Sequence, residues 1–313
     1  MALTVVLLLG RYPNAGFIAP SILRDDPLAQ RLVLELRLPR ALAAILLGAA
    51  LAVAGVVMQM LFANPLVEPG LIGVSHGAAL GASLMIVAVG GRPWAVQGAA
   101  AAGALIGLGC AYTIARRLRF GGWILRLVLA GIAVSAMLSA GVGLVKFAAD
   151  PLEQLPAITF WMLGGLWNVG WPELARVFPP VATAFVVLYS ARWRVNLLSL
   201  EDRVSFSLGA APGRERAAIL FAATVAVASV ISVAGVVGWV GLIVPHAARR
   251  LFRADAASAL PAAGLLGAIF VLLADGAART VVAGEIPLGV ITALLGAPAF
   301  VALMMTHNVR VAK

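Results

Sequence analysis

The sequence has little charge. Only 12% of its 313 residues are Asp, Glu, Lys or Arg, 62% are hydrophobic, and the mean hydropathy is +1.03. Soluble domains are typically about 25% charged and about 45–50% apolar. So few charged side chains cannot cover a water-facing surface, which excludes a soluble globular protein and a disordered protein. A nucleic-acid binder is excluded on the same ground, although the net charge of +10 taken alone would indicate one.

Cysteine and lysine are scarce as well. The single cysteine, Cys110, excludes a disulfide framework and an all-cysteine metal site within one chain. Lysine occurs only at Lys146 and Lys313, and neither follows the Walker A pattern G-K-[ST]. We therefore expect no P-loop for ATP on this chain. The chain is also expected to hold no cofactor and not to be an enzyme.

Long apolar runs are abundant instead. A spanning helix needs about 20 apolar residues, so this length allows roughly nine to eleven helices. We predict a single all-α polytopic membrane domain over residues 1–313, with about ten transmembrane helices. The helices are expected near residues 41–62, 71–90, 94–115, 127–148, 174–191, 217–237, 239–251, 260–277 and 288–306.

Two of the apolar segments are too short to cross a bilayer. Residues 239–251 are expected to form a half-helix or part of a broken one. Residues 1–10 would reach only about 15 Å as a helix. We interpret them as part of an incomplete first spanning helix, and a surface-lying segment is the alternative. Glycines spaced four apart at Gly73, Gly77 and Gly81, and at Gly103 and Gly107, indicate close helix packing.

Basic residues gather in alternate loops, which fixes the expected orientation. These loops and the tail contain Arg116, Arg117, Arg119, Arg126, Arg192, Arg194, Arg203, Arg214, Arg216, Arg249, Arg250, Arg253, Arg310 and Lys313. The positive-inside rule places them in the cytoplasm. The opposite loops, expected outside, contain Arg37, Arg40, Arg92, Asp150, Glu153, Arg279 and Glu285.

Few residues could carry chemistry. His76, His246 and His307 each lack a second histidine or an acid three or four positions away, so a zinc-protease or di-iron pattern is missing. His76 is either a pathway residue or a hydrogen-bonded histidine at a helix terminus. Asp275 lies in an apolar run, and Arg279, four residues on, has the spacing of an ion pair. These residues favour a channel or transporter over an intramembrane enzyme.

The scarcity of intramembrane acids argues against a proton relay and favours an external motor that acts on a cytoplasmic loop. The longest such loop is 192–216. Within it, Ser199 is expected to cap a short helix with Asp202 at its third position. Leu200, Val204 and Leu208 fall on one stripe of that helix, which ends at Gly209. The stripe predicts either a docking helix or a helix lying on the membrane surface.

Several separate blocks resemble one known family. They are Arg37-Leu-Pro-Arg40, Gly48 to Gln59, Asn64-Pro65-Leu66, Glu68 to Ser75, Gly77-Ala78, Gly238 to His246, Asp275 with Arg279, and Ile286 to Pro298. The set resembles the FecCD-type permeases, the membrane subunits of type II ATP-binding-cassette (ABC) importers for iron-siderophores, haem and vitamin B12. The match covers residues 31 to 306, and the blocks follow one another in the same order as in the family.

The resemblance implies a permease that moves a bulky metal chelate by alternating access across the bacterial cytoplasmic (inner) membrane. An iron-siderophore or haem is the expected cargo, with vitamin B12 as an alternative. A stand-alone channel or an ion-coupled carrier is the rival function. The implied partners are a second copy, two cytosolic ATPase subunits that bind ATP and Mg, and a periplasmic or tethered substrate-binding protein.

The resemblance also assigns residues. The ATPase-coupling segment, 197–209, would use Leu197, Ser199, Leu200, Glu201, Asp202, Val204, Leu208 and Gly209. Arg37, Arg40 and Arg279 would meet acidic residues of the binding protein, although Arg37 and Arg40 could instead anchor a helix end. The cytoplasmic gate, within 120–126, would contain Gly121, Gly122, Ile124 and Leu125, and its glycines would allow close backbone packing. His76, Phe160 and Trp161 are pathway candidates. An aromatic belt that includes Trp167 and Trp171 is the alternative for these rings.

Overall fold

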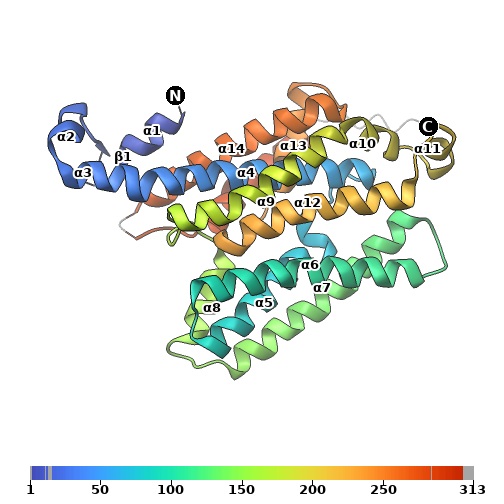
Figure 1. The fold of residues 1–313 in the computed structure, drawn as a ribbon, viewed down its shortest axis with the longest axis horizontal. Coiled ribbons are helices and arrows are strands. Elements are labelled where there is room, and N and C mark those ends of the chain that lie inside the picture. Colours follow the sequence, from blue (N-terminus) through green and yellow to red (C-terminus); the bar gives the residue numbers. More distant parts are fainter. Residues whose placement is uncertain (1, 11, 13–15, 283, 306–313) are drawn as a thin grey trace.

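The computed structural model describes residues 2–10, 12, 16–282 and 284–305, and it confirms an all-α membrane-type fold (Figure 1). Five of its helical stretches are long and apolar enough to span a bilayer. They are Pro27–Leu61, α6 (Pro93–Arg117), α7 (Trp123–Ala148), α12 (Pro212–Ala234) and α14 (Ala256–Thr280). A bent pair, α9 (Trp171–Ser190) and α10 (Arg192–Leu198), makes a sixth candidate span with a 61° bend.

This number is smaller than the ten or so full spans expected, because several helices are short. Helix α5 (Val74–Val89) is apolar but has only 16 residues. In α15 (Leu288–Met305), the apolar stretch Leu288–Leu303 is also shorter than a full span. The 12-residue α13 (Val240–Leu251) follows a break after α12, which confirms the half-helix prediction. The tail residues Arg310 and Lys313 lie outside the described part of the chain, as does His307.

The first long helix begins about 14 residues earlier than predicted. It joins α3 (Pro27–Arg31), a π-helical turn η1 (Leu32–Arg37) and α4 (Leu38–Leu61). Asp26 caps it by accepting a 2.8 Å hydrogen bond from the Leu28 N–H, and Pro27 suits the first helical position. At about 1.5 Å per residue, 35 residues exceed the roughly 30 Å bilayer core, so one end projects beyond it.

The N-terminal segment forms a compact cover at that projecting end. Helix α1 (Ala2–Leu8) has seven residues and buries Val6 against α14. Strands β1 (Leu9–Gly10) and β2 (Gly16–Phe17) pair antiparallel, and α2 (Pro20–Asp25) leads into α3. The described α1 is too short to span a bilayer.

Glycine pairs set the closest helix contacts. A Cβ added at Gly48 of α4 would collide with the backbone of Gly267 in α14. Between α5 and α6, the same holds for Gly77 against Gly103. The Gly77–Gly103 contact confirms the packing predicted from the four-residue glycine spacing. Helices α4, α12 and α14 run along the long axis, with α5, α6 and α7 packed beside them (Figure 1).

Two interruptions of helical structure lie against each other inside the bundle. The first joins α4 to α5 through the 3₁₀ turn η2 (Pro69–Ile72), and the second is residues 235–239 between α12 and α13. The buried Gln59 amide donates to the carbonyl oxygen of Leu242 at 3.1 Å, which ties α4 to α13. Trp239 has a φ of 71°, a strained value for a residue with a side chain.

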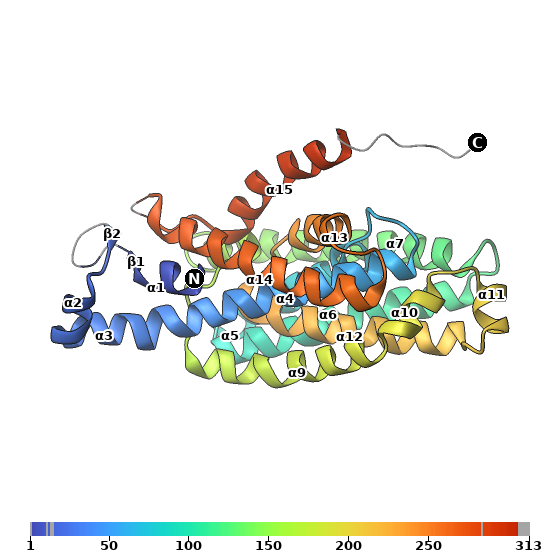
Figure 2. The same ribbon diagram turned by 90° about the horizontal axis from the view of Figure 1, so that it is seen from above.

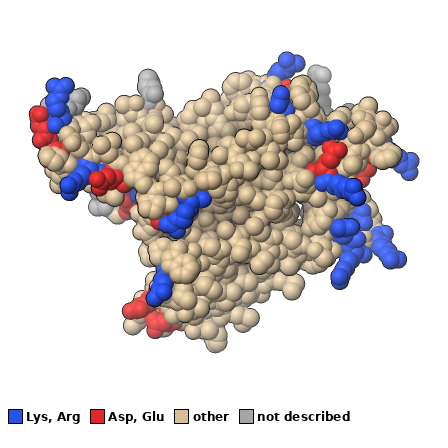
Figure 3. Space-filling model, viewed as in Figure 1, with Lys and Arg blue, Asp and Glu red and all other residues tan. Residues whose placement is uncertain are grey.

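Charge separates to the two ends of the molecule. On the face shown in Figure 3, Lys, Arg, Asp and Glu gather at both ends of the long axis, and the middle is uncharged. We call one end the arginine-rich end; it carries loops 116–126, 192–216 and 249–255. Figure 2 shows α15 standing away from the other helices.

Candidate docking, coupling and pathway sites

The predicted coupling segment, 197–209, contains the end of one short helix and the whole of a second at the arginine-rich end. Helix α10 continues from the bend after α9, and α11 (Asp202–Ser207) follows it (Figure 1). Gly209 has a φ of 82° and ends the segment as predicted. Four apolar side chains are exposed on this segment: Leu200, Val204, Phe206 and Leu208.

Two details of the sequence prediction were wrong here. Ser199 does not cap α11; it follows the last turn of α10, and its Oγ donates to the Asn196 carbonyl at 2.7 Å. The residue before α11 is Glu201, so the expected capping box is not formed. Phe206 is 73% exposed, more than any apolar residue of the predicted stripe. The stripe missed it because α11 is only six residues long, so one helical face does not describe the surface.

Contacts of α10 with α12 and α14, contacts of α11 with α12, and hydrogen bonds within this region hold the coupling segment. Ser205 is fully buried, and its Oγ donates to the Leu197 carbonyl at 2.6 Å. The Asn196 side-chain oxygen accepts from the Ala256 N–H at 2.8 Å and so satisfies the start of α14. Arg194 donates to the Gly209 carbonyl at 3.2 Å. The segment is therefore attached to the membrane helices rather than loosely suspended.

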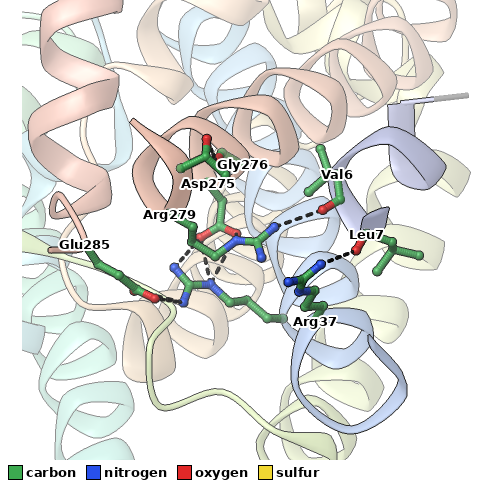
Figure 4. A network of polar contacts seen from close by, with 9 residues as sticks. Val6, Leu7, Arg37, Asp275, Gly276, Arg279 and Glu285 are labelled. Carbon is green, nitrogen blue, oxygen red and sulfur yellow. Dashed lines mark hydrogen bonds and ion pairs between the residues drawn. The ribbon is translucent and has the colours of Figure 1, made fainter. Parts of the chain in front are cut away.

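At the opposite end, Arg37, Arg40 and Arg279 come together in one network around Asp275 (Figure 4). Arg40 donates from Nη2 to Asp275 Oδ1 at 2.8 Å. Arg279 Nε lies 3.3 Å from Asp275 Oδ2, which confirms the predicted ion pair. Glu285 accepts from Arg40 Nη1 at 2.9 Å.

The remaining guanidinium groups satisfy the end of α1. Arg37 donates to the Leu7 carbonyl at 2.9 Å, and Arg279 donates to the Val6 carbonyl at 3.1 Å. Carbonyls in the last turn of a helix have no intrahelical partner and carry partial negative charge. Arg37 and Arg40 are each only 9% exposed. The three arginines thus lie at one end of the molecule, and their side chains are engaged inside the subunit.

An acidic side chain caps the N-terminus of the first long helix. The Tyr12 hydroxyl donates to Asp26 Oδ2 at 2.7 Å. This hydrogen bond, with that from the Leu28 N–H, lowers the pKa of the Asp26 carboxyl. Asp26 is therefore an ionised cap at the helix N-terminus, where negative charge is favoured.

The expected gate loop connects α6 to α7 at the arginine-rich end. Gly121 has a φ of 64°, and Gly122 precedes the first residue of α7. In the described part of the chain, no backbone packs against either glycine, so the close approach expected there is not made within this subunit. Leu125 is exposed and Ile124 is half-buried.

The pathway candidates line two different cavities. His76, in the first turn of α5, lines a cavity of about 200 Å³ together with Glu68 and Ser75. Its Nδ1 is buried and has no hydrogen-bond partner among the described residues, so the pathway role of His76 stays a prediction. Phe160 and Trp161, on α8 (Gln154–Leu163), line a separate cavity of about 290 Å³ with Trp167. The structure does not bring the three candidates into one space.

A third cavity, of about 420 Å³, lies on the side that carries α15. Among the residues that the structure describes, no charged side chain lines it. Its walls come from α8, the break after α12, and the start of α15: Met162, Leu163, Val236, Gly238, Trp239, Gly289, Val290, Ala293 and Leu294. Trp239 also makes an edge contact with Phe300 of α15, at 6.4 Å between ring centroids.

A helical membrane bundle with broken central helices, largely apolar cavities and an exposed helix at its arginine-rich end has the organisation of a transport permease. The model of the FecCD transport family matches residues 1–306. The chain belongs to this family, and it is the permease subunit of an ABC importer.

Curated relatives cover most of the chain. A probable iron chelatin transport system permease of Helicobacter pylori is 41% identical over 87% of this chain and 82% of its own length. A molybdate import permease of Haemophilus influenzae is 37% identical over 96% and 91%. A hemin transport permease of Yersinia pestis is 39% identical over 88% and 83%. A solved structure described as a metal-chelate-type ABC transporter, facing inward, has a TM-score of 0.90 and 35% identity, covering 98% of this chain and 96% of that one.

Proposed function

We propose that this chain is a single permease domain that works as one of two identical copies in the bacterial cytoplasmic membrane. Two ATPase subunits, which carry ATP and Mg, would drive it from the cytoplasm, and a substrate-binding protein would deliver cargo from outside. The exposed coupling segment at the arginine-rich end is the observation that carries this proposal. The positive-inside rule assigns that end to the cytoplasm.

The chemistry of the coupling segment supports contact with another protein. Phe206 and Leu208 project from a segment whose neighbouring side chains, Glu201, Asp202 and Arg203, are also exposed. An apolar centre with a charged rim is typical of protein interfaces. On a membrane surface the same rings would instead contact lipid. If the segment contacts an ATPase, loss of Phe206 should release that ATPase. If the segment lies on the membrane surface, the ATPase should stay bound.

The displaced helix α15 supports a dimer. Leu294, Leu295 and Val301 are exposed on it, beside the uncharged cavity of about 420 Å³. A second copy that covers this face would enclose the cavity between two subunits. Alternating access would then open that space first to one side of the membrane and then to the other.

The cavity walls favour a large cargo that is held weakly by the permease. The Helicobacter and Yersinia relatives are named for iron chelatin and hemin, and the Haemophilus relative for molybdate. A small oxyanion needs hydrogen-bond donors or positive charge for binding. The described walls of the cavity beside α15 carry no charged side chain, so a bulky metal chelate, an iron-siderophore or haem, suits it better.

Titration of the companion binding protein tests the cargo. That protein should bind a ferric siderophore or haem, and bind cobalamin and molybdate at least tenfold more weakly, as measured by calorimetry. Tight binding of molybdate alone would contradict the chelate assignment while leaving the permease assignment intact.

Docking of the binding protein is proposed to use Arg37, Arg40 and Arg279. Their burial means that a partner carboxylate has to compete with contacts that the arginines already make. Glu285 is the partner most open to such competition, because its side chain is 42% exposed.

Arg37→Gln is the cleanest docking variant, because Arg37 bonds only a carbonyl in this network and its loss leaves no buried carboxylate unpaired. We expect association of the loaded binding protein to slow about three- to tenfold at low salt, with the difference shrinking as salt rises. Surface plasmon resonance on the reconstituted complex measures this. Arg92→Gln, an equal charge change at an exposed outer residue, is the control. Equal slowing in both variants would mean that only overall charge matters.

A further inference from the structure

Arg216 occupies an unusual position at the base of the coupling segment. It lies in the first turns of α12 and is only 2% exposed. Arginine is almost never fully buried without compensating partners. The partners here all come from the coupling segment.

Three acceptors surround the Arg216 guanidinium. Its Nη2 donates to the Leu198 carbonyl at 2.7 Å and to the Leu200 carbonyl at 3.4 Å. Its Nη1 pairs with the Asp202 carboxylate. One cation therefore contacts the last residue of α10, the linker that follows, and the first residue of α11.

Electrostatics explain why an arginine suits this place. The last carbonyls of α10 lack intrahelical partners and carry partial negative charge. Asp202 adds a full charge at the start of α11, where the helix dipole also favours an anion. A planar guanidinium bridges separate acceptors simultaneously, whereas a lysine ammonium acts as a single point charge.

Helix α12 leads from this junction to the centre of the protein. It packs on α4, α6 and α9, and it ends at Ala234, where the break before α13 begins. Residues of that break line all three cavities described above. A displacement of the coupling segment therefore reaches the cavities along α12 if the segment and the helix move as one body.

We propose that Arg216 is a positioning residue that locks the coupling segment to α12, so that movement of the segment is passed on to the central break. This inference rests on the proposed function, because it takes the segment to be the ATPase contact. Arg216 itself is only 2% exposed and is therefore not part of the exposed docking surface, so it would control transmission and not attachment.

The test uses the complete importer, reconstituted with its ATPase pair and binding protein, and compares Arg216→Gln, Arg216→Lys and Asp202→Asn. Arg214→Gln, an exposed arginine in the same turn of α12, is the matched control. Three quantities are measured: ATPase retained on purification, ATP hydrolysed, and cargo transported per ATP.

We expect Arg216→Gln to retain the ATPase and its hydrolysis but to transport at least tenfold less cargo per ATP. Asp202→Asn leaves both carbonyl contacts, so the cargo that it transports per ATP should fall only about threefold. The cargo transported per ATP by Arg216→Lys should lie between the values of these two variants. The control should match the wild type. If Arg216→Gln transports as much cargo per ATP as the wild type does, the proposal is wrong.

Two further outcomes remain decisive. If Arg216→Gln does not fold, Asp202→Asn decides, and unchanged cargo per ATP in that variant overturns the proposal. If every Arg216 and Asp202 variant loses cargo transport and ATPase attachment together, Arg216 supports the docking surface and the transmission role is wrong. Failure of the wild-type chain to bind any ATPase would instead refute the proposed function.

Discussion

Asp275→Ala is expected to prevent accumulation of the folded subunit. Asp275 is the shared counter-ion of Arg40 and Arg279, and its side chain is 1% exposed. Removing it leaves two buried cations facing each other with only Glu285 nearby. Breaking a buried ion pair by deleting one partner costs about 3–5 kcal/mol. That amount is a large fraction of the total stability of a typical protein.

Detergent-solubilised protein provides the measurement. We expect a sharply reduced yield of monodisperse Asp275→Ala protein and a clearly lower thermal midpoint by tryptophan fluorescence. Glu285→Gln is the control, because Glu285 is partly exposed and its loss should cost about 1 kcal/mol or less. If Asp275→Ala melts like the wild type, the network does not stabilise this end of the bundle.

The second large effect is expected at the coupling segment. The double variant Phe206→Asp, Leu208→Asp should abolish transport by releasing the ATPase subunits. Burial of a large apolar side chain contributes about 1.5–3 kcal/mol, so losing two should weaken ATPase binding roughly a hundredfold or more. The double variant leaves the partners of Arg216 and Ser205 in place, so the segment should keep its shape.

Co-purification of the ATPase and uptake of cargo measure this effect. Phe252→Asp is the matched control, since Phe252 is 56% exposed at the same end of the molecule but outside the coupling segment. The control should retain both properties. An ATPase that stays bound to the double variant would favour a segment that lies on the membrane surface.

The features that follow a regular period were predictable from the sequence. Apolar runs located the long helices to within a few residues at most ends, and the shortness of 239–251 predicted a broken helix. The four-residue spacing of Asp275 and Arg279 predicted an ion pair, because those positions share a helix face. Glycine spacing predicted close helix approach for the same reason.

Features that depend on contacts across the fold were not predictable. Arg40 and Asp275 are 235 residues apart, and no periodicity links them. The sequence therefore suggested that Arg37 and Arg40 meet a partner or anchor a helix end, whereas the fold buries Arg40 against Asp275 and Arg37 against the end of α1. Helix α8 was missed because its run is short and is followed closely by tryptophans and glycines. Phe206 was missed because a six-residue helix has too few turns to define a stripe.

Uptake by sealed proteoliposomes tests the central claim most directly. Vesicles containing the purified chain alone are compared with vesicles that also contain its ATPase pair, with loaded binding protein outside and ATP within. We predict that labelled chelate enters only when the ATPase pair and ATP are both present. Uptake by the chain alone, without ATP, would contradict the conclusion that this permease takes its energy from a partner.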